Sequence, residues 1–150
     1  MPQEAAGLRK TPLNRVTRET GAKLVDFAGR ERPVQFRSLL EEHLAVRSRA
    51  GLFDVSHMGE IRVEGDGALE LLQHITPNDV ARLSPGQVQY SALLTPNGTF
   101  VDDVLVYRRE GKRYLLCVNA SNVEKDVRYV RENAGARTRE EDASAEYAQV

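Results

Sequence analysis

The stretch GQVQYSALLTPNGTFVDDVLVY, residues 86–107, decides how this chain is expected to fold. Residues 87–95 alternate and are rich in apolar side chains, and Thr95-Pro96-Asn97-Gly98 then supplies residues that favour a tight turn. Residues 99–107 are again strand-forming material. The stretch therefore predicts a β-hairpin at the centre of the fold.

Two adjacent acids, Asp102 and Asp103, lie in the second strand of this hairpin. Because successive strand residues face opposite ways, Asp103 shares a face with Tyr107 and Asp102 lies on the other. Both faces are mostly apolar, which predicts a strand covered on both sides. A buried carboxylate needs a partner or a ligand. Two interpretations stay open: both acids are solvated or bonded to turn amides near the strand end, or one acid lines a pocket with Tyr107.

Composition excludes several function classes. The 150 residues include 21 basic and 22 acidic ones, giving a net charge of −1, which indicates neither nucleic-acid nor membrane binding. No apolar run approaches the roughly 18 residues that a membrane-spanning helix needs, and residues 1–10 lack the hydrophobic region of a secretory signal. A single cysteine, Cys117, excludes an internal disulfide and indicates a reducing cytoplasm.

The other segments predict an α+β fold. From residue 59 onward, their order resembles a ferredoxin-like antiparallel sheet with helices on one face. Residues 28–36 read as a loop, and helices are expected to start at Thr11-Pro12, Ser38, Asp66 and Ser121. Strands are expected at residues 22–27, 59–64 and 113–118, with an edge strand at 137–141.

Residues 1–51 do not close a core alone. Residues 52–142 are expected to form the ferredoxin-like domain.

Isolated polar residues support no further site. The three histidines, His43, His57 and His74, lie on different predicted elements, which disfavours a zinc site. His57 is expected to be structural and bonded to the backbone. Met58 first reads as core filler, and Asn119 and Asn122 read as a strand-end turn and a helix cap.

Three stretches together resemble one family, the T-protein of the glycine cleavage system. The first comprises Thr11-Pro12-Leu13, residues 21–29 and Pro33-Val34-Gln35; the second is GLFDVSHMGEI, residues 51–61. The third is the central hairpin leading into VNASNVEKD, residues 118–126. The resemblance runs nearly end to end, and its combined order and spacing are specific.

The resemblance implies a tetrahydrofolate-dependent aminomethyltransferase. Such enzymes pass a one-carbon unit from the aminomethyl-lipoyl arm of the H-protein to tetrahydrofolate and release ammonia. On this basis Asp103 is the catalytic carboxylate, placed against the pterin, and Tyr107 lines the folate site. Met58 and Asn119 fall close to it, and Tyr90 is a further candidate.

The chain departs from the family at two positions and in length. Arg30 and Phe36 stand where the family usually has Trp and Tyr. Family members are considerably longer, so we expect this chain to be an N-terminal portion (a fragment, a truncated gene model or one half of a split protein) whose partner is the missing C-terminal portion. The resemblance also implies that residues 1–51 are the N-terminal part of a discontinuous folate-binding domain, and that residues 143–150 return toward that domain, where the sequence is truncated. The alternatives are a folate-dependent demethylase or the folate domain of a sarcosine-type dehydrogenase, a folate-binding relative that assists iron–sulfur assembly, and an inactive truncated module.

Overall fold

The computed structural model describes residues 7–150, so the first six residues of the leader considered above lie outside it. The chain divides into two compact units. Unit 1 comprises Met1–His57 with Ala148–Val150, and unit 2 comprises Met58–Tyr147. The domain boundaries predicted from the sequence, at residues 51 and 142, concern the domains of the complete protein and remain a proposal. Across the described residues, no helix is long and apolar enough to cross a membrane.

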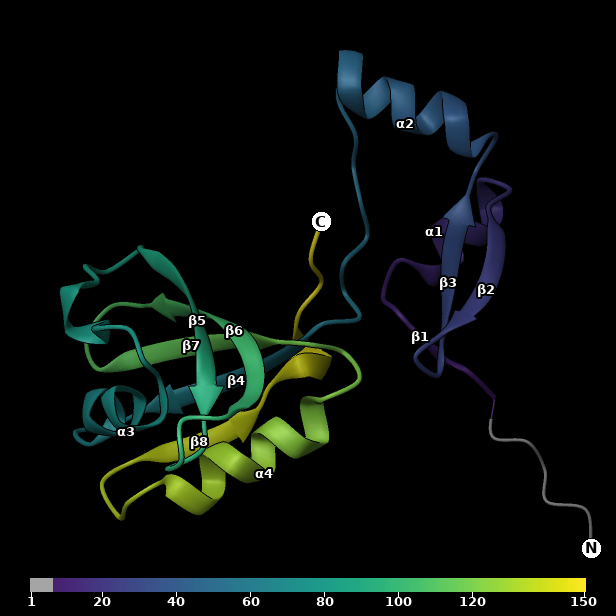
Figure 1. Ribbon diagram of the computed structural model, residues 1–150. Coiled ribbons are helices and arrows are strands. Elements are labelled where there is room, and N and C mark those ends of the chain that lie inside the picture. Colours follow the sequence, from purple (N-terminus) through teal and green to yellow (C-terminus); the bar gives the residue numbers. More distant parts are fainter. Residues whose placement is uncertain (1–6) are drawn as a thin grey trace, which may run out of the picture. The chain divides into compact units, whose positions relative to one another are not determined.

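Unit 1 is a small three-stranded sheet with two helices (Figure 1). The strands lie in the order β1-β3-β2, with β1 parallel and β2 antiparallel to β3. The elements are β1 (Arg9–Lys10), α1 (Asn14–Glu19), β2 (Lys23–Phe27), β3 (Arg30–Gln35) and α2 (Leu39–Ser48).

Strand β3 corrects the sequence prediction, which was wrong to read residues 28–36 as a loop. Ala28 and Gly29, with φ of 52° and 72°, form the tight turn from β2 into β3. Pro33 is tolerated because it lies beyond the two residues that β1 pairs with, so its missing N–H breaks no bond to β1. The strand forms by pairing with β2, and this pairing cannot be predicted from the strand propensities of residues 30–35 alone.

Helix starts were predicted with partial success. Ser38 caps α2 as expected, since its side chain accepts from the Glu41 amide at 3.4 Å. At the other three helices the cap falls one or two residues later than predicted. It is Leu13 rather than Thr11 before α1, Gly67 rather than Asp66 before α3, and Asn122 rather than Ser121 before α4.

Unit 2 is a five-stranded antiparallel sheet in the order β5-β6-β7-β4-β8. Without the edge strand β5, its strands and two helices follow the ferredoxin-like βαββαβ order, which confirms the predicted fold class. The elements are β4 (Gly59–Glu64), α3 (Ala68–Ile75), η1 (Val80–Arg82), β5 (Val88–Leu94), β6 (Phe100–Arg108), β7 (Arg113–Val118), α4 (Val123–Asn133), β8 (Arg139–Asp142) and η2 (Ser144–Glu146).

Helices α3 and α4 pack on one face of this sheet (Figure 1). Their buried residues, including Leu72 and Val130, form a single apolar core with the helix-facing strand residues. Gly59 of β4 allows a close approach, because a Cβ there would lie 2.4 Å from Cγ2 of Val123. The start of α4 is thereby held against the ends of β4 and β7.

The opposite face of the sheet is uncovered at β6, although Glu60, Ala92 and Cys117 on the same face are 1%, 4% and 5% exposed. On β6, Val104 and Val106 are 2% and 0% exposed, whereas Asp103 on the other face is exposed and Tyr107 is half-buried. The expectation that β6 is covered on both sides was therefore wrong for this chain, since unit 2 supplies a helical layer on one side only. We call this surface, formed by alternate residues of β4–β7 and their ends, the open face.

Candidate functional site

The five site residues expected from the resemblance all belong to the open face. Asp103 pairs with Ala92 of β5, two residues beyond Tyr90. Met58 and Asn119 lie one residue beyond the paired Gly59 and Val118, so the alternation of strand residues brings them to the same face. The fold thus assembles residues from four segments along one end of this face.

Asp103 is held by a hydrogen bond on each oxygen. The Tyr90 hydroxyl donates to Oδ2 at 2.8 Å, and the Asn119 Nδ2 donates to Oδ1 at 2.9 Å. The hydrogen bond to Asp103, together with the nearby negative charge, raises the pKa of Tyr90. Because Asp103 is exposed, its carboxylate is oriented yet still open to a ligand.

Tyr107 shares the face of Asp103 but not its immediate surroundings. Tyr107 follows Asp103 by four positions along the strand, which places their Cα atoms about 13 Å apart, and Leu105 lies between them on the same face. Burial, reinforced by the neighbouring Cys117 and Glu60, raises the pKa of Tyr107. Asp103 and Tyr107 therefore do not form a compact pair. They mark two places along one strand face, with the carboxylate at one end and the phenol further along.

Asp102 is neither solvated nor dependent on turn amides alone. It is 8% exposed and accepts from Nδ2 of Asn119 at 3.0 Å and from Nδ2 of Asn122 at 2.9 Å. Burial acts to raise the pKa of Asp102, but the neighbouring Asp126 carboxyl and the hydrogen bonds from Asn119 and Asn122 together outweigh it and leave the pKa below its usual value. The Asn119 amide thus donates to both acids and links the two faces of β6.

Sequence reasoning missed Asn122 and Asp126 as members of this network. Asn122 precedes α4 without a side-chain cap, because its amide bonds Asp102 instead. Asp126 lies one turn later and is fully buried beside Val127 and Val130. The sequence did carry a signal for Asp126, because an acidic residue next to the apolar side of a predicted helix indicates a buried polar contact.

Two hollows exist away from these residues. One, of about 570 Å³, lies in unit 2 between Arg62, Arg109 and Tyr147; the other, of about 900 Å³, lies in unit 1 beside α2. None of the five expected site residues lines either hollow. Within unit 2, the five residues therefore lie along the sheet surface and outside both of these hollows.

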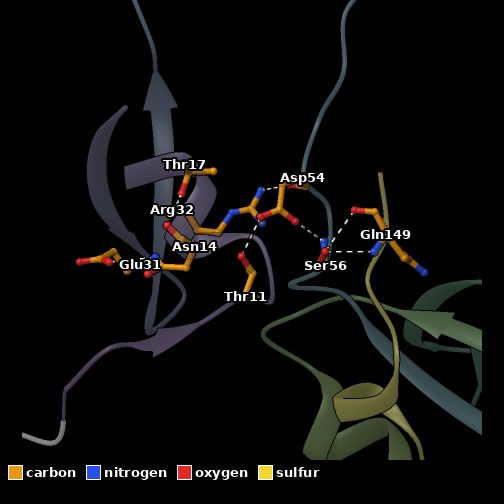
Figure 2. A network of polar contacts seen from close by, with 8 residues as sticks. All are labelled: Thr11, Asn14, Thr17, Glu31, Arg32, Asp54, Ser56 and Gln149. Atoms are coloured by element: carbon orange, nitrogen blue, oxygen red, sulfur yellow. Dashed lines mark hydrogen bonds and ion pairs between the residues drawn. The ribbon is translucent and has the colours of Figure 1, made fainter. Parts of the chain in front are cut away.

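Unit 1 contains a separate polar network around Asp54 (Figure 2). The Asp54 carboxylate accepts from the Thr11 hydroxyl at 2.7 Å and from the Ser56 amide at 2.9 Å, while the Arg32 guanidinium lies 3.7 Å away. The Ser56 hydroxyl donates to the Gln149 carbonyl at 3.2 Å. These bonds tie separate segments of unit 1 together, which is a structural role.

His57 follows this network directly in the chain. Burial and the positive charge of Arg32 lower its pKa, and its ring meets Phe27 edge-on at 5.9 Å. Its buried Nδ1 makes no hydrogen bond among the described residues, so the expected backbone bond is not found at that atom.

Comparison with known proteins connects this geometry to a family. Residues 13–150 match the family described as the GCVT N-terminal domain. The chain belongs to this family. The match includes both units and every residue of the Asp103 network, so the open face is part of the family's fold.

Relatives of known name agree with this assignment. An aminomethyltransferase of Koribacter versatilis is 50% identical and aligns with 99% of the chain, and one of Bacillus subtilis is 51% identical over 85% of it. The crystal structure of glycine cleavage system aminomethyltransferase T from Bartonella henselae superposes with a TM-score of 0.85 at 37% identity, covering 90% of the chain. The chain spans only 35–40% of the length of these proteins.

Proposed function

We propose that this chain is the N-terminal, folate-contacting part of an aminomethyltransferase of the glycine cleavage system. The complete protein would pass the methylene carbon from aminomethyl-lipoyl H-protein to tetrahydrofolate and release ammonia. The observation that carries the proposal is the exposed Asp103 carboxylate, oriented by Tyr90 and Asn119 on the open face of a family member.

The open face fits a reduced pterin. A flat heterocycle requires an apolar wall with few polar groups at its edge. Leu105 and Tyr107 of β6, both half-buried, provide such a wall along the strand, and Asp103 provides an acceptor at one end. Met58, Tyr90 and Asn119 complete the proposed binding residues at that end.

Asp103 has a specific role in this proposal. In the transfer, two folate nitrogens form bonds to the methylene carbon while the carbon's bonds to the departing ammonia and to the lipoyl sulfur break, which leaves the lipoyl arm as a dithiol. Positive charge develops on the attacking folate nitrogen before its proton is lost. A carboxylate fixed beforehand by two hydrogen bonds stabilises that charge and orients the attack without reorganising. Asp102 supports it through the shared Asn119 amide.

The proposal includes partners that act on the whole protein. The lipoyl group arrives on the glycine cleavage H-protein, and the C-terminal portion of the same protein completes the folate site, since the chain spans about two fifths of its relatives. We place this reaction in one-carbon metabolism in the cytoplasm, in keeping with the chain's one cysteine, which is buried.

The test begins with titration of the chain with tetrahydrofolate, alone and with a C-terminal portion added. That portion is the part of the Koribacter versatilis relative beyond the matched region. Binding by the chain alone indicates that the open face is a preformed half-site, and binding only with the added portion assigns the site to the reassembled protein. Absence of binding in both cases contradicts the proposal.

Turnover is tested in a fusion of this chain to the same C-terminal portion. The chain alone is expected to form no methylene-tetrahydrofolate, and the fusion to form it from aminomethyl-lipoyl H-protein. Asp103→Asn should lower kcat by about 100-fold or more, with a much smaller effect on folate affinity. Glu132→Gln, an exposed charge removal on α4, is the matched control. Equal losses of turnover and binding in Asp103→Asn would instead assign Asp103 a positioning role.

A further inference from the structure

Behind Asp103, two acids meet inside unit 2. Asp126, on α4, is 0% exposed, and Asp102, on the helix-facing side of β6, is 8% exposed. Asn122 connects them, because its side chain donates to Asp102 and its carbonyl accepts from the Asp126 amide at 2.9 Å. Two ionised carboxylates in such a place would repel one another at low dielectric.

The hydrogen-bond donors around Asp102 and Asp126 serve only Asp102. Asp102 receives donors from Asn119 and Asn122, whereas neither oxygen of Asp126 receives one from any residue in 7–150. The nearest cation to Asp126 is Lys125 Nζ at 3.8 Å, and that ammonium already donates to the Val101 carbonyl. Negative charge is therefore stabilised on Asp102 and not on Asp126.

A proton on Asp126 resolves this imbalance. As ions, the two carboxylates present only acceptors to each other, but a neutral Asp126 can donate its O–H to Asp102. Burial, then Asp102 and more weakly Asp103, raise the pKa of Asp126 to about 8, with Lys125 acting in the opposite direction.

We propose that Asp126 is a neutral positioning residue whose proton is shared with Asp102, and that this contact fixes the Asn119 amide and hence the rotamer of Asp103. The proposed path runs from α4 through β6 to the open face. The Asp126 proton bridges to the neighbouring Asp102, and the Asn119 Nδ2 donates to both Asp102 and Asp103. The location of the proton is independent of the proposed function; only the consequence for turnover rests on it.

Loss of that proton has a defined consequence. Ionised Asp126 would place a second negative charge next to Asp102. The two negative charges would then attract the side-chain amide donor of Asn119 toward the buried pair. Asn119 is the donor that Asp103 shares, so its bond to Asp103 weakens when Asp126 ionises. The orientation of Asp103 should then depend on pH above the Asp126 titration.

The direct test is carboxyl ¹³C NMR of the 150-residue chain labelled at aspartate Cγ. Asp126 is assigned from the resonance missing in Asp126→Asn. Its carboxyl is expected to titrate near pH 8, and the Asn119 side-chain amide resonances should shift over the same range. Titration of Asp126 below pH 5, or an Asn119 amide that does not follow it, would overturn the proposal. Glu132→Gln should leave both signals unchanged.

Two substitutions separate positioning from packing. Asp126→Asn keeps a donor toward Asp102 and should preserve the Asn119 amide shifts, whereas Asp126→Ala removes the donor and should move them. If the alanine variant does not fold, the wild-type titration decides alone. In the fusion protein, Asp126→Ala should lower kcat by about 10- to 100-fold with little change in KM, and Asp126→Asn should restore most of it.

The pH profile completes the test. The wild-type fusion should lose kcat as pH rises past the Asp126 titration, and Asp126→Asn should lack that loss. A fusion that binds no folate while Asp126 still titrates near pH 8 refutes the proposed function and leaves the shared proton standing. A fusion that is active while Asp126 titrates as an ordinary acid refutes the positioning role alone.

Discussion

Unit 1 and unit 2 differ in what they bury. Unit 2 encloses a continuous apolar core, in which Ile61, Leu72 and Leu116 are completely buried. In the described part of unit 1, the buried residues are polar ones such as Thr11 and Ser56, and no residue of α2 is buried. Leu40 of α2 is 66% exposed.

The difference teaches that the two units are stabilised by different forces. Burial of apolar surface contributes roughly 25 cal/mol per Å², so the core of unit 2 suffices to hold its sheet and helices together. Unit 1 depends on hydrogen bonds around Asp54, each with a modest net contribution of about 0.5–1.5 kcal/mol. The exposed apolar side of α2 shows that unit 1 leaves much of its apolar surface unburied.

The largest expected contrast is between a buried leucine of unit 2 and an exposed leucine of unit 1. Leu72→Ala should lower the free energy of unfolding of unit 2 by about 2–5 kcal/mol, because a cavity replaces a fully buried side chain. Leu40→Ala in α2 should change unit 1 by less than about 0.5 kcal/mol. Amide hydrogen exchange, read separately for each unit, measures both. Similar losses at the two positions would contradict the comparison.

The units should also respond to pH in opposite directions. Because the pKa of Asp126 is raised in the folded state, folded unit 2 binds a proton that the unfolded chain releases above about pH 4. Unit 2 should therefore lose stability as pH rises from 4 toward about 8, by at most about 1.4 kcal/mol per pH unit. Asp126→Asn should remove this slope in exchange measurements.

Unit 1 should lose stability on acidification instead. The folded-state pKa of His57 is lowered by burial and by Arg32, so the unfolded chain takes up its proton first, from about pH 6.5 downward. Asp54 adds a second loss below about pH 4, because hydrogen bonds from Ser56 and Thr11 and the charge of Arg32 outweigh burial and lower its pKa. His57→Gln should abolish the first loss, and a unit 1 that is more stable at pH 5 than at pH 7 would refute the assignment.

A glycine substitution tests how closely unit 2 is packed. Gly59→Ala should cost about 1–3 kcal/mol, since overpacking forces stiff neighbours to move and the new Cβ would meet Val123 at 2.4 Å and Val118 at 2.9 Å. Gly135→Ala meets nothing within 4 Å and is the matched control. The midpoint of thermal unfolding should be lower for Gly59→Ala than for Gly135→Ala. Equal midpoints would show that α4 can shift away from β4 without loss of stability.

The smallest effect is expected in the polar network of unit 1. Asp54→Ala should destabilise unit 1 by about 1–2 kcal/mol, because Thr11 and the Ser56 amide lose their acceptor and Arg32 its counter-charge. Glu19→Gln, at an exposed ion pair with Arg15, should change it by less than about 0.5 kcal/mol. Exchange rates in unit 2 should stay unchanged in both variants.

Much of unit 2 was predictable because local and tertiary signals agree there. The observed bounds of β4 and β7 equal the predicted strands at residues 59–64 and 113–118, and the hairpin of β5 and β6 forms around Thr95–Thr99. Unit 1 was harder, since β3 forms only by pairing with its neighbours. Helix caps were displaced where Asp66 instead binds Lys112 and Thr11 instead binds Asp54.

The sequence by itself determined that the two acids lie on opposite faces of their strand and that Asp103 shares its face with Tyr107. Strand alternation is a local property of the backbone, so Asp103 and Tyr107 were placed on one face from residue numbers alone. Tertiary structure decided the rest. Which face the helices cover, how Asn119 bridges the acids and why Asp126 is buried against Asp102 all depend on α4 packing over β6, and no local pattern encodes the distance between segments that are far apart in the chain.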